Sequence, residues 1–202
     1  MRIWIFLFFL ICIPASLFSQ KRQLQKGNVR LSFGSKSEVV ISGSSNVTGF
    51  TCVYQQDISC KGLLFEGDYA ANAIILSNAR LSLESCGFDC GNSVMNKDFQ
   101  KTIQSGTHPE IVLEIQELHF EKEPCIEGEE VNVNAMVYLK VAGTRKKYVI
   151  RSKGKLEQND LVIYGDFSVC MTDFCLVPPS LMFGLVTVDP ILEIGFRFAL
   201  SY

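Results

Sequence analysis

The feature that most constrains this chain is an apolar side chain at every second position between Val131 and Val141, with Asn132, Asn134, Met136, Tyr138 and Lys140 between them. Every second residue there is apolar: Val131, Val133, Ala135, Val137, Leu139 and Val141. The alternation returns near the C terminus, where one face carries Leu192, Ile194, Phe196, Phe198 and Leu200. A period of two is typical of antiparallel strands with one face in a core and the other in water. The chain is therefore expected to be rich in such strands.

Weaker copies of this pattern predict most of the remaining structure. They cover residues 29–33, 38–42, 49–54, 62–66, 80–84, 111–120, 147–151 and 161–171, with Gly, Asn, Ser and Asp between them. Residues 141–145, centred on Gly143, predict a short hairpin loop. Only residues 92–104 show a helical period, with Asn92 or Ser93 as the cap and Gly106 after the end. Eight or more strands and one helix indicate a closed barrel or a sandwich, and we favour the barrel because closure removes exposed edges.

The first residues have the composition of a secretory signal. Met1 and Arg2 precede an uninterrupted apolar run over residues 3–14, which is shorter than the about 20 residues needed to span a bilayer. Small residues follow, and the chain turns polar at Gln20. We expect residues 1–19 to be a signal peptide and residues 20–202 one domain, the alternative being an uncleaved anchor.

Seven cysteines remain after the expected cleavage: Cys52, Cys60, Cys86, Cys90, Cys125, Cys170 and Cys175. Some should pair in an oxidising compartment, and an odd number leaves at least one thiol. Spacing alone leaves the pairs open. Residues 52 and 60 would face each other across a turn, 86 and 90 would meet only across a turn, and 170 and 175 would need a bend between them.

The composition excludes some classes of function. The net charge is −2 without a basic stripe, so nucleic acid is not an expected partner. His108 and His119 lack metal-ligand spacing, and no C-x-x-C or nucleophile-elbow motif occurs. We expect no metal, no cofactor and no catalytic residues. A thiol enzyme built on the odd cysteine is the alternative within the enzyme class.

Several blocks of sequence resemble YceI-like, polyisoprenoid-binding proteins. They lie between residues 37 and 200, in the order found in that family: SGSSNVTGFTC (42–52), LSLESCGFDCGNSVMNKD (81–98), HPEI (108–111), LVIYGDF (161–167), MTDF (171–174), PP (178–179), GLVTVD (184–189) and residues 191–198. The chain departs from the family at Phe50-Thr51-Cys52, around Cys60, and in its number of cysteines.

The resemblance implies a lipocalin-like antiparallel β-barrel of about eight strands with one helix. Such proteins hold an isoprenoid or another apolar lipid inside the barrel, and many are exported, so we expect a periplasmic or secreted protein. The resemblance also implies a Cys52–Cys90 disulfide first and a Cys52–Cys60 disulfide second. Contact with membranes would be transient, and a homodimer is compatible with this interpretation.

The expected ligand-binding residues are the inward apolar side chains. They are Phe50, Leu81, Leu83, Ile111, Leu113, Ile115, Val133, Ala135, Val137, Leu139, Ile194, Phe196 and Phe198. The rival interpretation is an envelope protein whose barrel is filled and which acts through protein–protein contacts.

Overall fold

The computed structural model describes residues 27–58, 64–70, 72–122 and 127–201. The expected signal peptide, Cys60 and Cys125 lie outside the described residues.

Most of the described chain forms one 12-stranded antiparallel sheet. Its strands are β1 (Gly27–Phe33), β2 (Glu38–Ser44), β3 (Gly49–Tyr54), β4 (Leu64–Ala70), β5 (Ala73–Ser77), β6 (Arg80–Glu84), β7 (Phe88–Asp89), β8 (Glu110–Phe120), β9 (Val131–Val141), β10 (Thr144–Glu157), β11 (Asp160–Cys170) and β14 (Ile191–Ser201). A small second sheet pairs β12 (Ser180–Leu181) with β13 (Val186–Thr187). One α-helix, α1 (Ser93–Thr102), and the short 3-10 turns η2 (Ser85–Gly87), η3 (Met171–Phe174) and η4 (Met182–Gly184) complete the fold.

The large sheet curls into a barrel that differs between its two ends. At one end, β1 pairs with β14 through Phe33 and Leu200, so the path β1-β4-β5-β8-β9-β10-β11-β14 returns to its first strand. Further along β14 the same edge pairs instead with β2, which leads to β3 and β7. In this second half, no ladder among the described strands joins β3 or β7 to β6 or β8. The expected all-β fold is confirmed.

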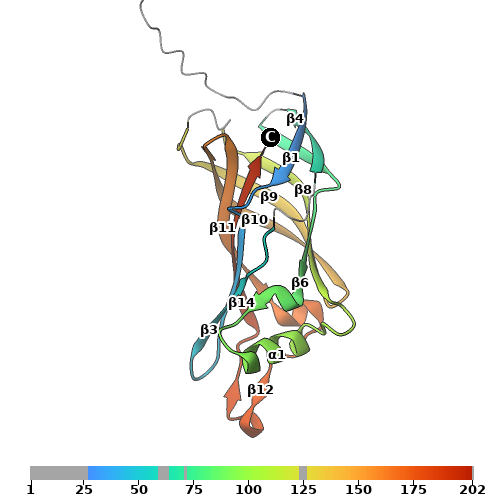
Figure 1. Ribbon diagram of the computed structural model, residues 1–202, viewed down its shortest axis with the longest axis vertical. Coiled ribbons are helices and arrows are strands. Elements are labelled where there is room, and N and C mark those ends of the chain that lie inside the picture. Colours follow the sequence, from blue (N-terminus) through green and yellow to red (C-terminus); the bar gives the residue numbers. More distant parts are fainter. Residues whose placement is uncertain (1–26, 59–63, 71, 123–126, 202) are drawn as a thin grey trace, which may run out of the picture.

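The helix and the small sheet lie together at one end of the barrel. Figure 1 shows α1 and β12 at the end opposite the C terminus. Within the described residues, no helix has the length and apolar character needed to cross a membrane.

The strand β9 and its turn follow the sequence pattern closely. Its even-spaced apolar residues are buried, while Asn132, Asn134 and Lys140 are exposed. Ala142 and Gly143 connect β9 to β10 with φ values of 46° and 79°. Two positive φ values give a two-residue hairpin turn the same twist as the strands that it joins. The hairpin loop expected at residues 141–145 is confirmed. Strand β10, however, is longer than the predicted 147–151, and β5 was not predicted.

The helix is also close to its prediction. The side chain of Asn92 caps it by accepting hydrogen bonds from the N–H groups of Val94 and Met95. Phe99 is half-buried against the barrel, and Ile103, just after the helix, is buried. The helical segment therefore packs against the barrel through Met95, Phe99 and Ile103, which are spaced by four residues.

Candidate functional site

The inside of the barrel holds an apolar cavity of about 110 Å³. Every side chain that lines it is apolar, and they come from the strands of the barrel, from α1 and its end, and from η3 and the residues after it. The lining residues are Val39, Ile41, Leu81, Leu83, Phe88, Phe99, Ile103, Ile111, Leu113, Ile115, Leu118, Ala135, Val137, Leu139, Val141, Ile150, Ile163, Phe167, Val169, Met171, Phe174, Leu176, Leu192, Ile194, Phe196, Phe198 and Leu200. We call this hollow the inner cavity.

Most of the expected ligand-binding residues line the inner cavity. These are Leu81, Leu83, Ile111, Leu113, Ile115, Ala135, Val137, Leu139, Ile194, Phe196 and Phe198. Two do not. Phe50 lies outside the inner cavity, in the groove described next, and Val133 packs where the backbone of Gly154 comes close.

A second hollow of about 220 Å³ opens beside α1, and we call it the outer groove. It shares part of its lining with the inner cavity: Ile41, Phe99, Ile103, Met171, Leu176 and Leu192. Its remaining lining comes from the loop between β2 and β3, from β3, from Cys90 after β7, from α1, and from residues 179–188. It includes the polar side chains Ser45, Thr48, Asp98 and Thr102. The two hollows therefore adjoin at these shared side chains, and polar side chains line only the outer groove.

Gly43 makes room for one wall of the outer groove. A Cβ at Gly43 would lie 2.5 Å from the Phe50 ring and 2.8 Å from a methyl of Leu192. Both of these side chains line the groove. Only a residue without a side chain lets the ring lie across β2 at this point.

A disulfide between Cys52 and Cys90 fastens the end of the barrel where the ladder is interrupted. This is the pair that the resemblance implied first. The Cys52–Cys60 alternative does not form, because Cys52 is already bonded to Cys90. Both sulfur-bearing residues line the outer groove, so the disulfide is part of its wall.

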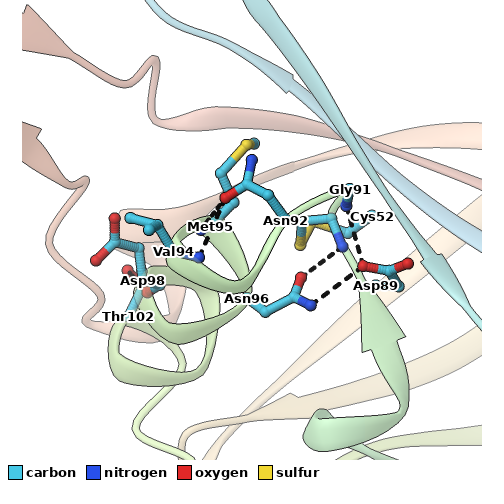
Figure 2. Close-up of a disulfide and its surroundings, with 10 residues drawn as sticks. Cys52, Asp89, Gly91, Asn92, Val94, Met95, Asn96, Asp98 and Thr102 are labelled. Carbon is cyan, nitrogen blue, oxygen red and sulfur yellow. Dashed lines mark hydrogen bonds between the residues drawn. A yellow bond between two sulfur atoms is a disulfide. The ribbon is translucent and has the colours of Figure 1, made fainter.

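The helix is attached to this disulfide by a small polar network (Figure 2). The side chain of Asn96 accepts a hydrogen bond from the N–H of Cys90 at 2.7 Å and donates one to Asp89 at 3.1 Å. Asp89 also accepts from the N–H of Gly91 at 3.0 Å. The Asn96 bond first, and the Gly91 bond second, hold the pKa of Asp89 below its usual value.

The other end of the barrel interior is filled. Val133, Val131 and Phe120 pack around Gly154, where a Cβ would lie 2.8 Å from a methyl of Val133. A glycine on β10 is needed for this close packing. The inner cavity therefore adjoins the outer groove on the side of α1, whereas side chains pack closely around Gly154.

Reactive side chains are scattered over the described residues. No group of three or more His, Cys, Asp or Glu side chains that could hold a metal is found in the described part. The clustered carboxylates are engaged elsewhere: Glu114 with Arg145, Glu117 with His119, Glu129 with Lys122, and Glu130 with Lys153 and Tyr164.

Three of the described cysteines are free. Cys86 is exposed in η2, and Cys170 and Cys175 flank η3. The bend that residues 170 and 175 would need is present, yet both thiols are free. Cys170 Sγ lies 3.0 Å from the hydroxyl of Thr172.

Comparison with known proteins identifies the fold. No family model matches the sequence, and no match is found among the curated proteins. Among solved structures, a polyisoprenoid-binding domain from Saccharophagus degradans aligns with a TM-score of 0.57 at 10% identity, over 85% of this chain and 97% of that one. BcnA from Burkholderia cenocepacia aligns with a TM-score of 0.56 at 11% identity, over 83% and 97%. The YceI protein of Campylobacter jejuni is similar at 13% identity over 96% and 98%, with a TM-score of 0.42.

The first two of these structures have the fold that the blocks of sequence implied. At such identities they establish architecture. The chain has the barrel fold of YceI-like, polyisoprenoid-binding domains.

Proposed function

We propose that this protein is an exported, non-catalytic binding protein that holds a polyisoprenoid or another apolar lipid inside its barrel. The observation that carries the proposal is the inner cavity, whose lining side chains are all apolar and which adjoins the outer groove. The side chains that line the inner cavity offer no polar group to bind a polar substrate. The structural neighbour from Saccharophagus degradans, described as a polyisoprenoid-binding domain, supports the choice of ligand class.

Binding would be driven by removal of the hydrocarbon chain of the lipid from water. Burying about ten lipid carbons gains roughly 8 kcal/mol, at about 0.8 kcal/mol per carbon, before the costs of association. Little polar chemistry is therefore needed for useful affinity. An apolar surface that fits the chain is sufficient.

The volumes of the inner cavity and the outer groove suggest how the lipid would lie. The inner cavity, about 110 Å³, is smaller than typical ligand pockets of about 300–1,000 Å³. A long chain would therefore fill the cavity and continue along the outer groove. Its polar end would then lie near Ser45, Thr48 and Asp98 at the outer part of the groove.

Export and the absence of catalysis are also part of the proposal. The signal-like composition of residues 1–19 supports export to the periplasm or secretion, and the Cys52–Cys90 disulfide suits such an oxidising compartment. Lipid binding of this kind requires no cofactor. The partner in the proposal is the lipid, with transient contact to the membrane that supplies it.

Filling the inner cavity tests the proposal. Ala135→Trp places an indole among the lining residues and should abolish uptake of a dansyl-labelled farnesyl probe. Asn134→Trp is the matched control, because Asn134 is exposed on the outer side of the same strand. Circular dichroism and thermal melting verify folding, and Val137→Phe is a smaller cavity-filling change in case Ala135→Trp does not fold. Unchanged uptake in a folded cavity-filled variant would overturn the proposal.

A filled barrel that acts through protein contacts is the second candidate. A chain of aromatic rings inside the barrel favours it: Tyr148–Phe167 at 5.7 Å, Phe167–Phe196 at 6.3 Å, Phe196–Phe198 at 5.3 Å and Phe198–Phe33 at 5.2 Å between centroids. Under this alternative, the wild-type protein would not bind the farnesyl probe. Ala135→Trp would then change stability alone.

A further inference from the structure

Large apolar side chains are exposed at the end of the molecule that carries the outer groove. Phe183 is fully exposed, and Leu185 and Val47 are 74% and 69% exposed. We call these three residues the apolar tip. Single exposed apolar residues are common on protein surfaces, but a group of them beside a groove marks an interaction site.

The apolar tip is built from two loops held to each other. The side chain of Asn46 donates to the carbonyl of Leu185 at 2.9 Å and accepts from the N–H of Thr187 at 2.9 Å. A β-bridge pairs Ser45 with Val188, and the N–H of Asn46 donates to the carbonyl of Thr187 at 3.1 Å. The loop between β2 and β3 and the β12–β13 hairpin therefore present their apolar side chains from one unit.

The backbone at Phe183 supports a role for its ring. Phe183 has φ 56° and ψ 33°, a left-handed conformation that a bulky residue rarely adopts. Gly184, which follows it, also has a positive φ. A glycine at position 183 would satisfy this turn more easily than phenylalanine, so the turn geometry alone does not account for the aromatic residue.

Charged residues are missing from both segments that form the tip. None occurs in residues 39–56 or in residues 174–188, although charged residues make up 20% of the whole chain. A charged partner would therefore find no complementary group on these segments. An uncharged surface with exposed Phe, Leu and Val fits the apolar interior of a bilayer just below its headgroups.

The tip also adjoins the outer groove. Ser45 and Thr48 from one loop, and Val186 and Val188 from the hairpin, line that groove. Figure 1 shows the hairpin of β12 projecting beyond α1 at the same end. A lipid that leaves a bilayer at the tip could thus slide into the groove without its chain crossing water, which would cost roughly 0.8 kcal/mol per exposed carbon.

We propose that the apolar tip docks on a lipid bilayer by inserting Phe183 and Leu185, and so places the outer groove against the membrane for transfer of lipid. The purpose of docking rests on the proposed function. Docking itself depends only on the tip. Because the tip is uncharged, docking should need neither anionic lipids nor low salt.

Vesicle flotation tests the docking. Lipid-free protein is mixed with phosphatidylcholine vesicles at about 0.15 M and about 1 M salt, and the floated fraction is measured. We expect wild-type protein to float equally at both salt concentrations. The double variant Phe183→Asp/Leu185→Asp should float about tenfold less or worse, because two apolar contacts are lost. Phe183→Gly, which suits the backbone better, should lower flotation without adding charge.

A matched control uses exposed apolar residues elsewhere. Ile75 and Val149 are 57% and 66% exposed, on β5 and β10. The variant Ile75→Asp/Val149→Asp adds the same charge and should float like the wild type. Three outcomes would overturn the proposal: an equal loss in this control, flotation only at the lower salt concentration, or conversion, seen by gel filtration, of a wild-type dimer to monomers by Phe183→Asp/Leu185→Asp. The last would show that a second copy covers the tip.

A parallel uptake assay separates this proposal from the proposed function. The tip variant should still take up the dansyl-farnesyl probe from solution and lose uptake from vesicles. Ala135→Trp should float and take up no probe. A wild-type protein that floats but refuses the probe would overturn the proposed function and support docking, whereas one that takes up the probe but does not float would overturn docking alone.

Discussion

The side-chain oxygen of Asn96 accepts a hydrogen bond from the backbone N–H of Cys90, with 2.7 Å between the two atoms. Through this bond the only α-helix of the described chain is fastened to the disulfide that joins β3 to the residue after β7. The helix forms one side of the outer groove through Met95, Phe99 and Thr102. The amide of Asn96 thus helps to position one wall of the groove.

Removing that amide should loosen the helix. Asn96→Ala leaves the N–H of Cys90 without its acceptor, which costs about 1–3 kcal/mol, while alanine returns about half a kcal/mol of helix propensity. We expect a net loss of about 1 kcal/mol in the free energy of unfolding, measured by denaturant titration. Lys97→Ala, at an exposed neighbouring position, should change it by less than about 0.5 kcal/mol. Equal effects in the two variants would contradict this role of Asn96.

The same network predicts a pH dependence. The pKa of Asp89 lies below its usual value, chiefly because Asn96 donates to its carboxylate. A depressed pKa in the folded state contributes stability above the unfolded-state pKa, and this contribution is lost as pH falls through the folded-state pKa. NMR titration of the Asp89 carboxyl should show a lowered midpoint in the wild type and a higher one in Asn96→Ala. An ordinary midpoint in the wild-type protein would be inconsistent with the network.

Gly43 should control the shape of the outer groove. In Gly43→Ala the new Cβ would force the Phe50 ring and Leu192 to move, since it would lie 2.5 Å and 2.8 Å from them. Because the contacted atoms are the far ends of flexible side chains, the loss of stability should be only about 1 kcal/mol, while lipid-probe affinity should fall as the groove narrows. Gly195→Ala is the control, because its Cβ would have no neighbour closer than 3.9 Å. Similar melting temperatures and affinities for both variants would show that the groove does not need this glycine.

Tyr148 carries a buried hydroxyl without a hydrogen-bond partner among the described residues. Its ring packs on Phe167 and Phe174, which line the inner cavity. Tyr148→Phe should therefore stabilise the lipid-free protein by about 1 kcal/mol, by removing an unsatisfied polar group. Tyr164→Phe should do the opposite, since the hydroxyl of Tyr164 is bonded to Glu130. Thermal melting of both variants checks the signs, and a destabilised Tyr148→Phe would contradict the assignment.

Parts of the fold were predictable because their patterns are long and regular. Strand β9 alternates over its whole length, and α1 has both a capping residue and a helical stripe. Strand β5 has no long alternating pattern. Ala73–Ser77 is a short apolar run in which Ile75 faces solvent. Such runs cannot be assigned from periodicity.

The candidate site was predictable in its inner part and not at its opening. Inward strand residues such as Leu113 and Ala135 share the alternation, so they could be assigned to the lumen together. Phe50 follows the same pattern but lies in the outer groove, because β3 belongs to the end of the barrel where the ladder is interrupted. Phe183 and Leu185 would be assigned to a core by composition. Only the arrangement of the β12–β13 hairpin leaves them exposed.

The central claim is that the inner cavity holds a lipid, and mass spectrometry of an organic extract tests it most directly. The extract would be taken from mature protein purified out of its native envelope. The account predicts a stoichiometric isoprenoid, quinone or other apolar lipid, absent from an equally prepared Ala135→Trp variant. An extract without lipid, from a protein that also does not bind the added dansyl-farnesyl probe, would contradict the claim. That result would favour a filled barrel that acts through protein contacts.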